Sequence, residues 1–300
     1  MVFMNARLCS FLGVSMTNRV LPWVATLLFN SLACLPLAML QSMGQAAGWI
    51  AWIVPGSFKR LSNANFAHAF PNASPQMLRG AMLSVGQMFL EMPYWWVRRN
   101  DHALNQTVAE ADWHLFEEAL NQGNGVILLS PHMGCFELLG PVYSSRHQST
   151  VLFRPPRMIW LREWIVAMRT RQKLKMAPAN QTGVRSLVRA LRKGQTVGIL
   201  PDQVPVLGEG VWAPFFGRPA YTMTLVQRLQ TLTSAKIFVL GVERLGIAKG
   251  YRMHIAPMQE TLSLNPTEAA TQVNLALEAM IRIAPAQYLW GYNRYKQPVV

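Results

Sequence analysis

The stretch GVILLSPHMGCFE, residues 125–137, decides the fold, because a short apolar run stands directly before a histidine and a glutamate. A run of this length, bounded by glycine and proline, is typical of a strand buried in a sheet. The expected strand covers residues 125–130 and ends at Ser130-Pro131, and helix signals resume at Phe136. His132 is therefore predicted to lie in a loop at the C-terminal end of a strand, where ligand crevices form in α/β sheets.

His132 and Glu137 stand five residues apart. On one straight α-helix this separation turns the two side chains about 140° away from each other, so they would not share a face. They can meet only if Glu137 lies in the first turns of the following helix and folds back towards the loop, a reversal for which Gly134 supplies backbone freedom. The carboxylate would then orient one imidazole nitrogen and leave the other as a general base for a hydroxyl.

Two alternatives stay open for this stretch. A histidine and a glutamate at this spacing also occur together by chance. In that case the two residues would only be polar side chains in a turn. Cys135 lies inside the motif and is either a rival nucleophile or a small packing residue. The sequence contains no GxSxG elbow, so direct transfer with His132 as base is preferred to a covalent acyl-enzyme.

Short β-rich runs alternate with helical patterns over the rest of the chain, which predicts an α/β fold with a central, mostly parallel or mixed sheet flanked by helices. Residues 61–300 contain no repeat or polar linker and are predicted to form one domain. Further strands are expected at 150–154, 196–200, 236–242 and, more weakly, 251–255. Helices are expected at 76–98, 112–122, 136–146, 158–174, 182–193, 221–233 and 266–284.

The N-terminal part of the chain has no Asp, Glu, Lys or Arg from residue 20 to residue 58. This run is longer than the roughly 20 residues that cross a bilayer. Prolines at 22, 36 and 55 and glycines at 44 and 48 interrupt it, so a bent or re-entrant helical anchor is expected over residues 1–60 rather than one straight helix. A pair of buried core helices is the alternative.

The chain is strongly basic, with 28 Lys and Arg against 14 Asp and Glu and a net charge of +14. Such a charge suits an anionic partner: nucleic acid, a phospholipid surface or a phosphorylated substrate. Long uncharged stretches and the lack of a nucleic-acid motif favour a membrane or lipid and argue against nucleic acid. The three cysteines show no metal or disulfide spacing, and the six histidines show no HxH or HExxH pattern, so neither a metal nor another cofactor is expected.

Basic residues concentrate between positions 154 and 175, where seven Lys and Arg stand against one glutamate. Because a guanidinium binds phosphate through a planar fork, contacts to a phosphorylated glycolipid or an acidic carrier protein are expected here. A face resting on anionic headgroups is the alternative. Such a headgroup-facing surface is also the plain interpretation of Arg185, Arg189 and Arg192, which recur at helical spacing.

Two further stretches carry candidate functional residues. Asp202 ends a strand in ILPDQ and either orients a basic residue or a substrate group, or only caps a turn after Pro201. The apolar stretch VWAPFFGRPAYT, residues 211–222, either lines an acyl-chain channel or packs into the core.

Several motifs in order along nearly the whole chain resemble the late acyltransferases of lipid A biosynthesis, within the His-x4-Asp/Glu glycerolipid acyltransferase superfamily. They are NANFAHAFP (63–71), SPHMGCFE (130–137), FRP (153–155), LRKGQTVGILPDQ (191–203), APFFGRPAYT (213–222) and APAQYLWGYNRYK (284–296). The resemblance implies a glycerol-3-phosphate acyltransferase-like fold. It also implies an enzyme on the cytoplasmic face of the bacterial inner membrane that moves a fatty acyl chain from acyl carrier protein, or coenzyme A, to a hydroxyl of a lipid A precursor.

The same resemblance implies roles for particular residues. His132 would be the base and Glu137 its orienting carboxylate, while Arg171 and Asp202 would organise the polar part of the substrate. Arg169 and Arg154 are further candidates for substrate binding. Two alternatives remain: transfer to another amphiphile, such as a lysophospholipid, aminolipid or glycolipid, and a non-catalytic membrane scaffold with the same fold.

Overall fold

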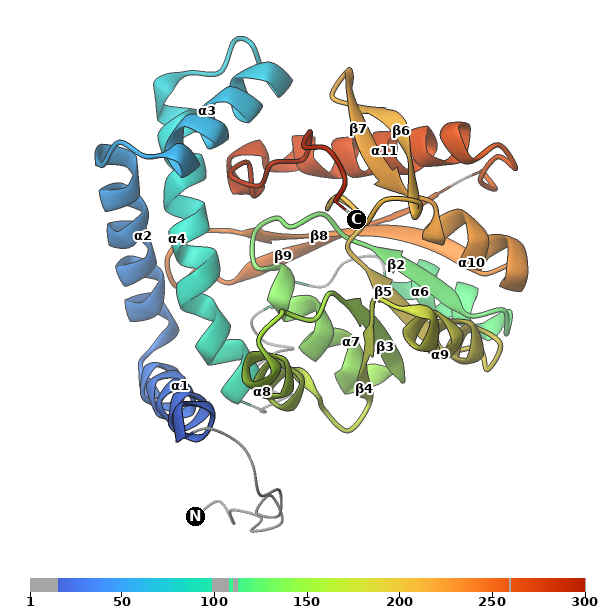
Figure 1. Cartoon of the computed structure of the whole chain (residues 1–300), viewed down its shortest axis with the longest axis horizontal. Helices are drawn as coiled ribbons and strands as arrows, with labels where there is room; N and C mark the ends of the chain where they lie inside the picture. The colour runs from blue at the N-terminus through green and yellow to red at the C-terminus, as the bar shows by residue number, and fades with distance from the viewer. Residues whose placement is uncertain (1–15, 99–107, 110–112, 259, 300) are drawn as a thin grey trace.

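The computed structural model describes residues 16–98, 108–109, 113–258 and 260–299. Within these residues a seven-stranded sheet runs in the order β1-β9-β8-β2-β5-β3-β4 (Figure 1). Neighbours are parallel from β8 to β4, whereas β9 runs antiparallel to β8. The expected α/β fold with a mostly parallel sheet is therefore confirmed. The strands are β1 Val108–Ala109, β2 Val126–Leu129, β3 Ser149–Phe153, β4 Leu174–Pro178, β5 Thr196–Ile199, β8 Lys236–Arg244 and β9 Tyr251–Pro257.

Helices cover both faces of this sheet, which explains why the decisive apolar run reads as continuous rather than alternating. In β2, Ile127 and Leu129 belong to a core shared with α9 (Gln181–Leu191), α10 (Leu225–Thr233) and α11 (Pro266–Ile283). Val126 and Leu128 point to the other face and pack with α6 (Trp113–Asn121) and α7 (Leu139–Arg146). All four residues of β2 are buried.

One expected helix is too long at its C-terminal end. α8 covers Ile159–Arg169, and residues 174–178, at its expected end and beyond, form the edge strand β4. The chain leaves the helix at Thr170, whose backbone is extended, and turns back through a bridge between Arg171 and Leu174. The exposed Lys175 suits an edge strand, since charge there discourages pairing with another chain.

A hairpin outside the main sheet was not expected from the sequence. β6 (Gly210–Phe215) and β7 (Arg218–Met223) are antiparallel, so the helix expected from 221 begins only at Leu225. The two turn residues, Phe216 and Gly217, both have positive φ (48° and 75°), which is the geometry of a type I′ hairpin turn. Phenylalanine is rare in this conformation, so the turn carries no usual sequence signal.

The N-terminal residues form helices α1 (Met16–Cys34), α2 (Leu37–Ile53) and α3 (Ser57–Ala69), which precede the long helix α4 (Pro75–Val97) (Figure 1). Among the described residues, no single helix has the length and apolarity to cross a membrane. The segments Val20–Cys34 and Leu37–Ile53 meet those criteria only as a pair, bent by 115° at the break between them. The expected bend is therefore confirmed, while the anchoring role and the division at residue 60 stay predictions.

Helix α2 packs on α4 at very short range, because glycines face each other where the helices cross. A Cβ atom added to Gly44 would lie 2.5 Å from Gln87 Cα, and one added to Gly86 would lie 2.7 Å from the Gly48 nitrogen. Small residues at such spacing let two backbones touch. The N-terminal helices are thus tightly joined to the rest of the fold.

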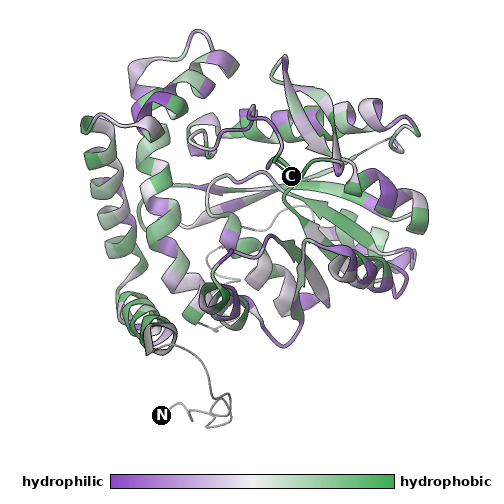
Figure 2. Cartoon of the chain, in the orientation of Figure 1, coloured by the Kyte–Doolittle hydropathy of each residue, from purple (hydrophilic) through white to green (hydrophobic). Residues whose placement is uncertain are grey.

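The exposed side of these helices is apolar. Figure 2 shows hydrophobic colouring along α1 and α2, and α2 buries only Leu40, Gln41, Gly44 and Gly48. The large exposed apolar side chains here are Val20, Leu21, Trp23, Val24, Leu27, Leu28, Met39, Met43, Trp49, Ile50 and Ile53. So many exposed apolar side chains do not fit a pair of buried core helices, the alternative considered from the sequence.

We expect Gly86→Val to destabilise the protein by about 1–3 kcal/mol, because the new side chain forces α2 away from α4. Urea unfolding measures the free energy, and limited proteolysis between α2 and α3 reports local separation. Gly56→Ala is the matched control, since no atom lies within 4 Å of an added Cβ. Equal stability of the two variants would contradict the close contact.

Candidate active site

The loop after β2 holds His132 through its backbone. The His132 N–H donates to Asp202 Oδ2 (2.8 Å), and the His132 carbonyl accepts from the Leu289 N–H (2.9 Å). Gly134 has φ of +55°, and an added Cβ would collide with the carbonyl of Val242. The reversal at Gly134 expected from the sequence is therefore present, and only glycine fits it.

The imidazole of His132 is held by Asp202. His132 Nδ1 lies 2.7 Å from Asp202 Oδ1, and the aspartate is 2% exposed. Burial alone would raise the pKa of Asp202, but the charge and hydrogen bonds of His132 outweigh it and hold that pKa below its ordinary value of 3.8. An ionised Asp202 accepts the proton of Nδ1, which leaves the lone pair on Nε2, where the Gln203 amide stands 3.1 Å away.

The expected contact between Glu137 and His132 is wrong. Residues 136–138 form a 3-10 turn, and the ring of Phe136, not the carboxylate, packs against the imidazole at 4.8 Å between centroids. Glu137 accepts instead from Trp96 Nε1 (2.9 Å) and is ion-paired with Arg169. The carboxylate of the motif thus orients an arginine rather than the histidine.

Arg169, one of the two arginines considered near position 170, is joined to the motif. Its guanidinium pairs with Glu137 and lies over the Trp96 ring at 4.6 Å from the centroid. Arg169 Nε is buried without a hydrogen-bond partner in the described part of the chain. Arg171 donates to the carbonyls of Trp95 (2.5 Å) and Arg98 (3.1 Å). These two hydrogen bonds tie Arg171 to the C-terminal end of α4.

A cavity of about 880 Å³ brings these side chains together. His132, Glu137, Arg154, Arg169 and Arg171 line it, and Asp202 stands behind His132. Arg154 donates to the Val204 carbonyl (3.2 Å). All six residues expected from the sequence therefore gather in one place, although in different pairs.

The cavity follows one face of the sheet towards the start of the strands. Its lining includes alternate residues of four strands and the positions that follow them: Leu128 and Ser130; Ser149, Val151 and Phe153; Leu174 and Met176; Thr196, Gly198 and Leu200. Leu152 and Ile199 line it as well. At about 3.3 Å per residue, the span from Leu200 to Thr196 is about 13 Å. Val151 packs over Gly198, where an added Cβ would lie 3.0 Å from Val151 Cγ2. This part of the cavity is a mainly apolar slot that begins beside His132.

The aromatic residues of the hairpin are not part of this cavity. Phe215 and Phe216 are buried in the core with Trp290 and α11, and Trp212 is exposed. Core packing, one of the two interpretations of that stretch, is therefore correct for the two phenylalanines.

Cys135 does not fit the role of a nucleophile. Its side chain is 2% exposed and lies in the core on the α7 side. Burial, followed by the nearby charge of Glu91, raises the pKa of the thiol well above its ordinary value. The reactive thiolate is thus disfavoured. Among the described residues, no three His, Cys, Asp or Glu side chains are placed to hold a metal ion.

The pairing of His132 with Asp202 was missed in the sequence, although a signal for it exists. β2 and β5 are parallel neighbours with Leu129 opposite Ile199, and each of the two functional residues follows its strand by three positions. Both strands end alike, in Ser-Pro-His and Leu-Pro-Asp. Once β2 and β5 are known to be adjacent, this repeated pattern puts the two side chains side by side.

Comparison with known proteins agrees with the resemblance. The family model for bacterial lipid A biosynthesis acyltransferases matches residues 12–297. The chain is 27% identical over 267 residues to the lipid A biosynthesis palmitoleoyltransferase of Escherichia coli (strain K12), covering 87% of this chain and 86% of that protein. It is 24% identical over 273 residues to the lipid A biosynthesis lauroyltransferase of the same organism, covering 87% of each.

A lipid A biosynthesis acyltransferase of Haemophilus influenzae is also similar, with 25% identity over 288 residues, 91% of this chain and 89% of that protein. The molecule is thus an α/β acyltransferase. The chain belongs to the bacterial lipid A biosynthesis acyltransferase family. Membership sets aside the non-catalytic scaffold.

Proposed function

We propose that this enzyme transfers a fatty acyl chain from an acyl thioester, carried by acyl carrier protein, to a hydroxyl of a lipid A precursor, with His132 as general base. The observation that carries this proposal is the contact between His132 Nδ1 and the buried Asp202 at the end of an apolar cavity. A histidine held in this way keeps one basic nitrogen, Nε2, in a fixed place, as acyl transfer to a hydroxyl requires, and the acceptor hydroxyl would take the place of the Gln203 amide that donates to it.

The reaction needs two proton movements at this nitrogen. Nε2 of His132 takes the proton of the acceptor hydroxyl as its oxygen forms a bond to the thioester carbon. The resulting tetrahedral intermediate breaks its carbon–sulfur bond, and the imidazolium returns the proton to the departing sulfur. An ester and a free thiol are the products, and the ionised Asp202 stabilises the imidazolium between the two steps.

The Arg169 guanidinium, oriented by Glu137, would stabilise the negative charge that develops on the carbonyl oxygen of the thioester. Arg169 lines the cavity, and Glu137 and the Trp96 ring fix the plane of its guanidinium. A donor held in place before the reaction stabilises an oxyanion without reorganising. Glu137 would therefore act through Arg169.

We expect Arg169→Lys to lower kcat by about 10²- to 10³-fold, since lysine lacks the planar guanidinium that Glu137 and Trp96 hold in place. Steady-state rates with a fixed acyl thioester measure the effect. Arg162→Lys, an exposed position on the same helix that does not line the cavity, is the matched control and should keep the wild-type rate. Similar rates for both variants would contradict the role of Arg169.

The slot along the sheet would hold the acyl chain. Each buried CH2 contributes about 0.8 kcal/mol, so an apolar chain lying along the alternate residues of β3 and β5 gains substantial binding energy. The polar end of the substrate would remain near the basic side chains of Arg154 and Arg171, which line the same cavity.

Attachment to the cytoplasmic face of the inner membrane is part of the proposal. It is supported by the apolar outer face of α1 and α2 and by the net charge of +14, which suits an anionic lipid surface. Co-sedimentation with vesicles of phosphatidylglycerol and phosphatidylethanolamine tests it. Binding that is unaffected by replacing Trp23 and Trp49 with glutamine would argue against this surface.

The function itself is tested by incubating the purified full-length chain with a lipid A precursor and either acyl-acyl carrier protein or acyl-coenzyme A. Mass spectrometry then measures the masses of the lipid products. The proposal expects one added acyl chain with the carrier-protein donor. Parallel reactions with a lysophospholipid and an aminolipid test the other acceptors. Acylation of one of these alone would overturn the lipid A acceptor but retain the chemistry.

A further inference from the structure

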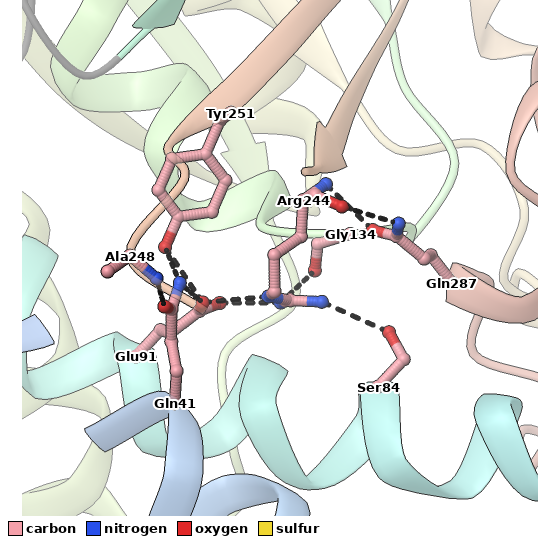
Figure 3. Close-up of polar contacts among 8 residues, drawn as sticks. All are labelled: Gln41, Ser84, Glu91, Gly134, Arg244, Ala248, Tyr251 and Gln287. Atoms are coloured by element: carbon pink, nitrogen blue, oxygen red, sulfur yellow. Dashed lines mark hydrogen bonds and ion pairs between the residues drawn. The ribbon is translucent and has the colours of Figure 1, made fainter. Parts of the chain in front are cut away.

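A buried ion pair behind the active site is not used by the reaction described above. Glu91, on α4, is fully buried, and Arg244, at the end of β8, is 5% exposed. Arg244 Nε donates to Glu91 Oε1 (2.7 Å) and its Nη2 donates to Oε2 (2.5 Å), so the pair is bidentate (Figure 3). This geometry is the strongest and most directional that two such groups can adopt.

The pair reaches the loop of His132 through Gly134. Arg244 Nη2 also donates to the Gly134 carbonyl (3.3 Å), as Figure 3 shows. The side chain of Gln287 accepts from the Arg244 N–H (2.8 Å) and donates to the Arg244 carbonyl (3.0 Å). The backbone carbonyl of Gln287 accepts from the Gly134 N–H (2.8 Å). Both backbone polar groups of Gly134 are therefore fixed by Arg244 and by the residue that holds Arg244.

The carboxylate of Glu91 is braced from the opposite side. Gln41, fully buried on α2, donates to Glu91 Oε1 (2.8 Å) and accepts from the Ala248 N–H (2.8 Å). The Tyr251 hydroxyl donates to the same Glu91 oxygen (2.7 Å). The network thus runs without a break from an N-terminal helix, through α4 and the β8–β9 hairpin, to the loop two residues from His132.

Stability alone does not explain charges at this place. Removing two charges from water costs several kcal/mol per ion, and buried ion pairs can often be replaced by apolar residues without loss of stability. Burial would lower the pKa of Arg244, but its hydrogen bonds and charge interaction with Glu91 outweigh this and raise the pKa, so the guanidinium stays charged. The bidentate hydrogen bonds fix the direction in which the Arg244 guanidinium points, and an apolar side chain could not do this.

We propose that Glu91 and Arg244 are positioning residues for acyl transfer, which fix the Gly134 carbonyl and thereby the place of His132 relative to the cavity. The inference rests on the proposed role of His132 as base. Neither residue lines the cavity, so neither touches the substrate. A shift of about 1 Å in a catalytic group is enough to cost about 10²-fold in rate, which gives a distant support of this kind a measurable effect.

The test is a paired substitution, because Arg244→Met alone would leave Glu91 buried without its cation. In Glu91→Gln with Arg244→Met, both charges are removed and the glutamine can still accept from Gln41 and Tyr251. We expect a folded protein with unchanged KM for the acyl donor and a kcat lower by about 10- to 100-fold. If this double variant fails to fold, the single variant Arg244→Lys is tested instead. Lysine keeps the positive charge but lacks the planar guanidinium, so the same fall in kcat is expected.

The matched control is Glu278→Gln with Arg282→Met, which removes an ion pair on α11 that has no contact with Gly134. A readout independent of rate is the NMR signal of the proton on His132 Nδ1, identified by its loss in His132→Ala. We expect this signal to shift in the Glu91/Arg244 variant and to stay in place in the control.

A kcat within twofold of the wild type in the folded variant, or an equal fall in the control, would overturn the proposal. So would an unchanged Nδ1 proton signal. Failure of the wild type to transfer acyl chains would instead overturn the proposed function, and the NMR comparison would still decide whether the pair positions His132.

Discussion

Replacing His132 by alanine is expected to lower kcat for acyl transfer by about 10²- to 10⁴-fold, because the acceptor hydroxyl then loses the group that removes its proton. KM for the acyl thioester should change little, since His132 is only one of many residues that line the cavity that would hold the chain. Initial rates at saturating acceptor measure kcat. Circular dichroism and vesicle binding establish that the variant folds and attaches as the wild type does.

The matched control for this substitution is His254→Ala. His254 lies on β9, pairs with Glu243 at 2.9 Å and does not line the cavity. Its loss should leave the rate near that of the wild type. If His132→Ala kept more than a tenth of the wild-type kcat, the histidine would not be the base.

Asp202→Asn is expected to be nearly as damaging, although it changes only one atom of the carboxylate. In serine proteases, replacing the aspartate that holds the histidine by asparagine lowers kcat by about 10⁴-fold, because the imidazole adopts the wrong tautomer. Here the asparagine oxygen would still accept from the backbone N–H of His132. Its amide would then face Nδ1, so the proton moves to Nε2 and the base is lost. The pH dependence of kcat measures this change.

The same substitution has a distinct effect on acid stability. The pKa of Asp202 is lower in the folded than in the unfolded chain, so its ionisation stabilises the fold above the ordinary pKa of 3.8. That contribution is lost as the pH falls below 3.8 and through the folded pKa. Wild type and Asp202→Asn should therefore differ most in free energy of unfolding at neutral pH and converge in acid.

The sequence predicted the strand and loop around His132 because two physical constraints meet there. A strand buried on both faces needs a continuous apolar run, and β2 has one. Pro131 and Gly134 then mark the end of the strand and the reversal after it. Both signals are local, so they can be read without knowing the rest of the fold.

The partners of His132 and Glu137 could not be predicted in the same way, because they depend on which strands and helices are neighbours. Asp202 meets His132 only because β5 lies beside β2, and Arg169 meets Glu137 only because α8 ends beside the 3-10 turn. β4 and β7 were missed for another reason. β4 is an edge strand with the exposed Lys175, and β7 begins with the exposed Arg218 and Pro219, so neither has the continuous apolar run that marks β2.

The two hydrogen bonds between His132 and Asp202 limit how the substrates can be placed during the reaction. Asp202 accepts both from the backbone and from Nδ1, so the ring has no freedom to turn over between the two halves of the transfer. One nitrogen must then serve the incoming oxygen and the outgoing sulfur in succession. The acceptor hydroxyl would therefore have to attack the face of the thioester that is turned towards His132, and an acceptor that could reach only the opposite face would bind without reacting.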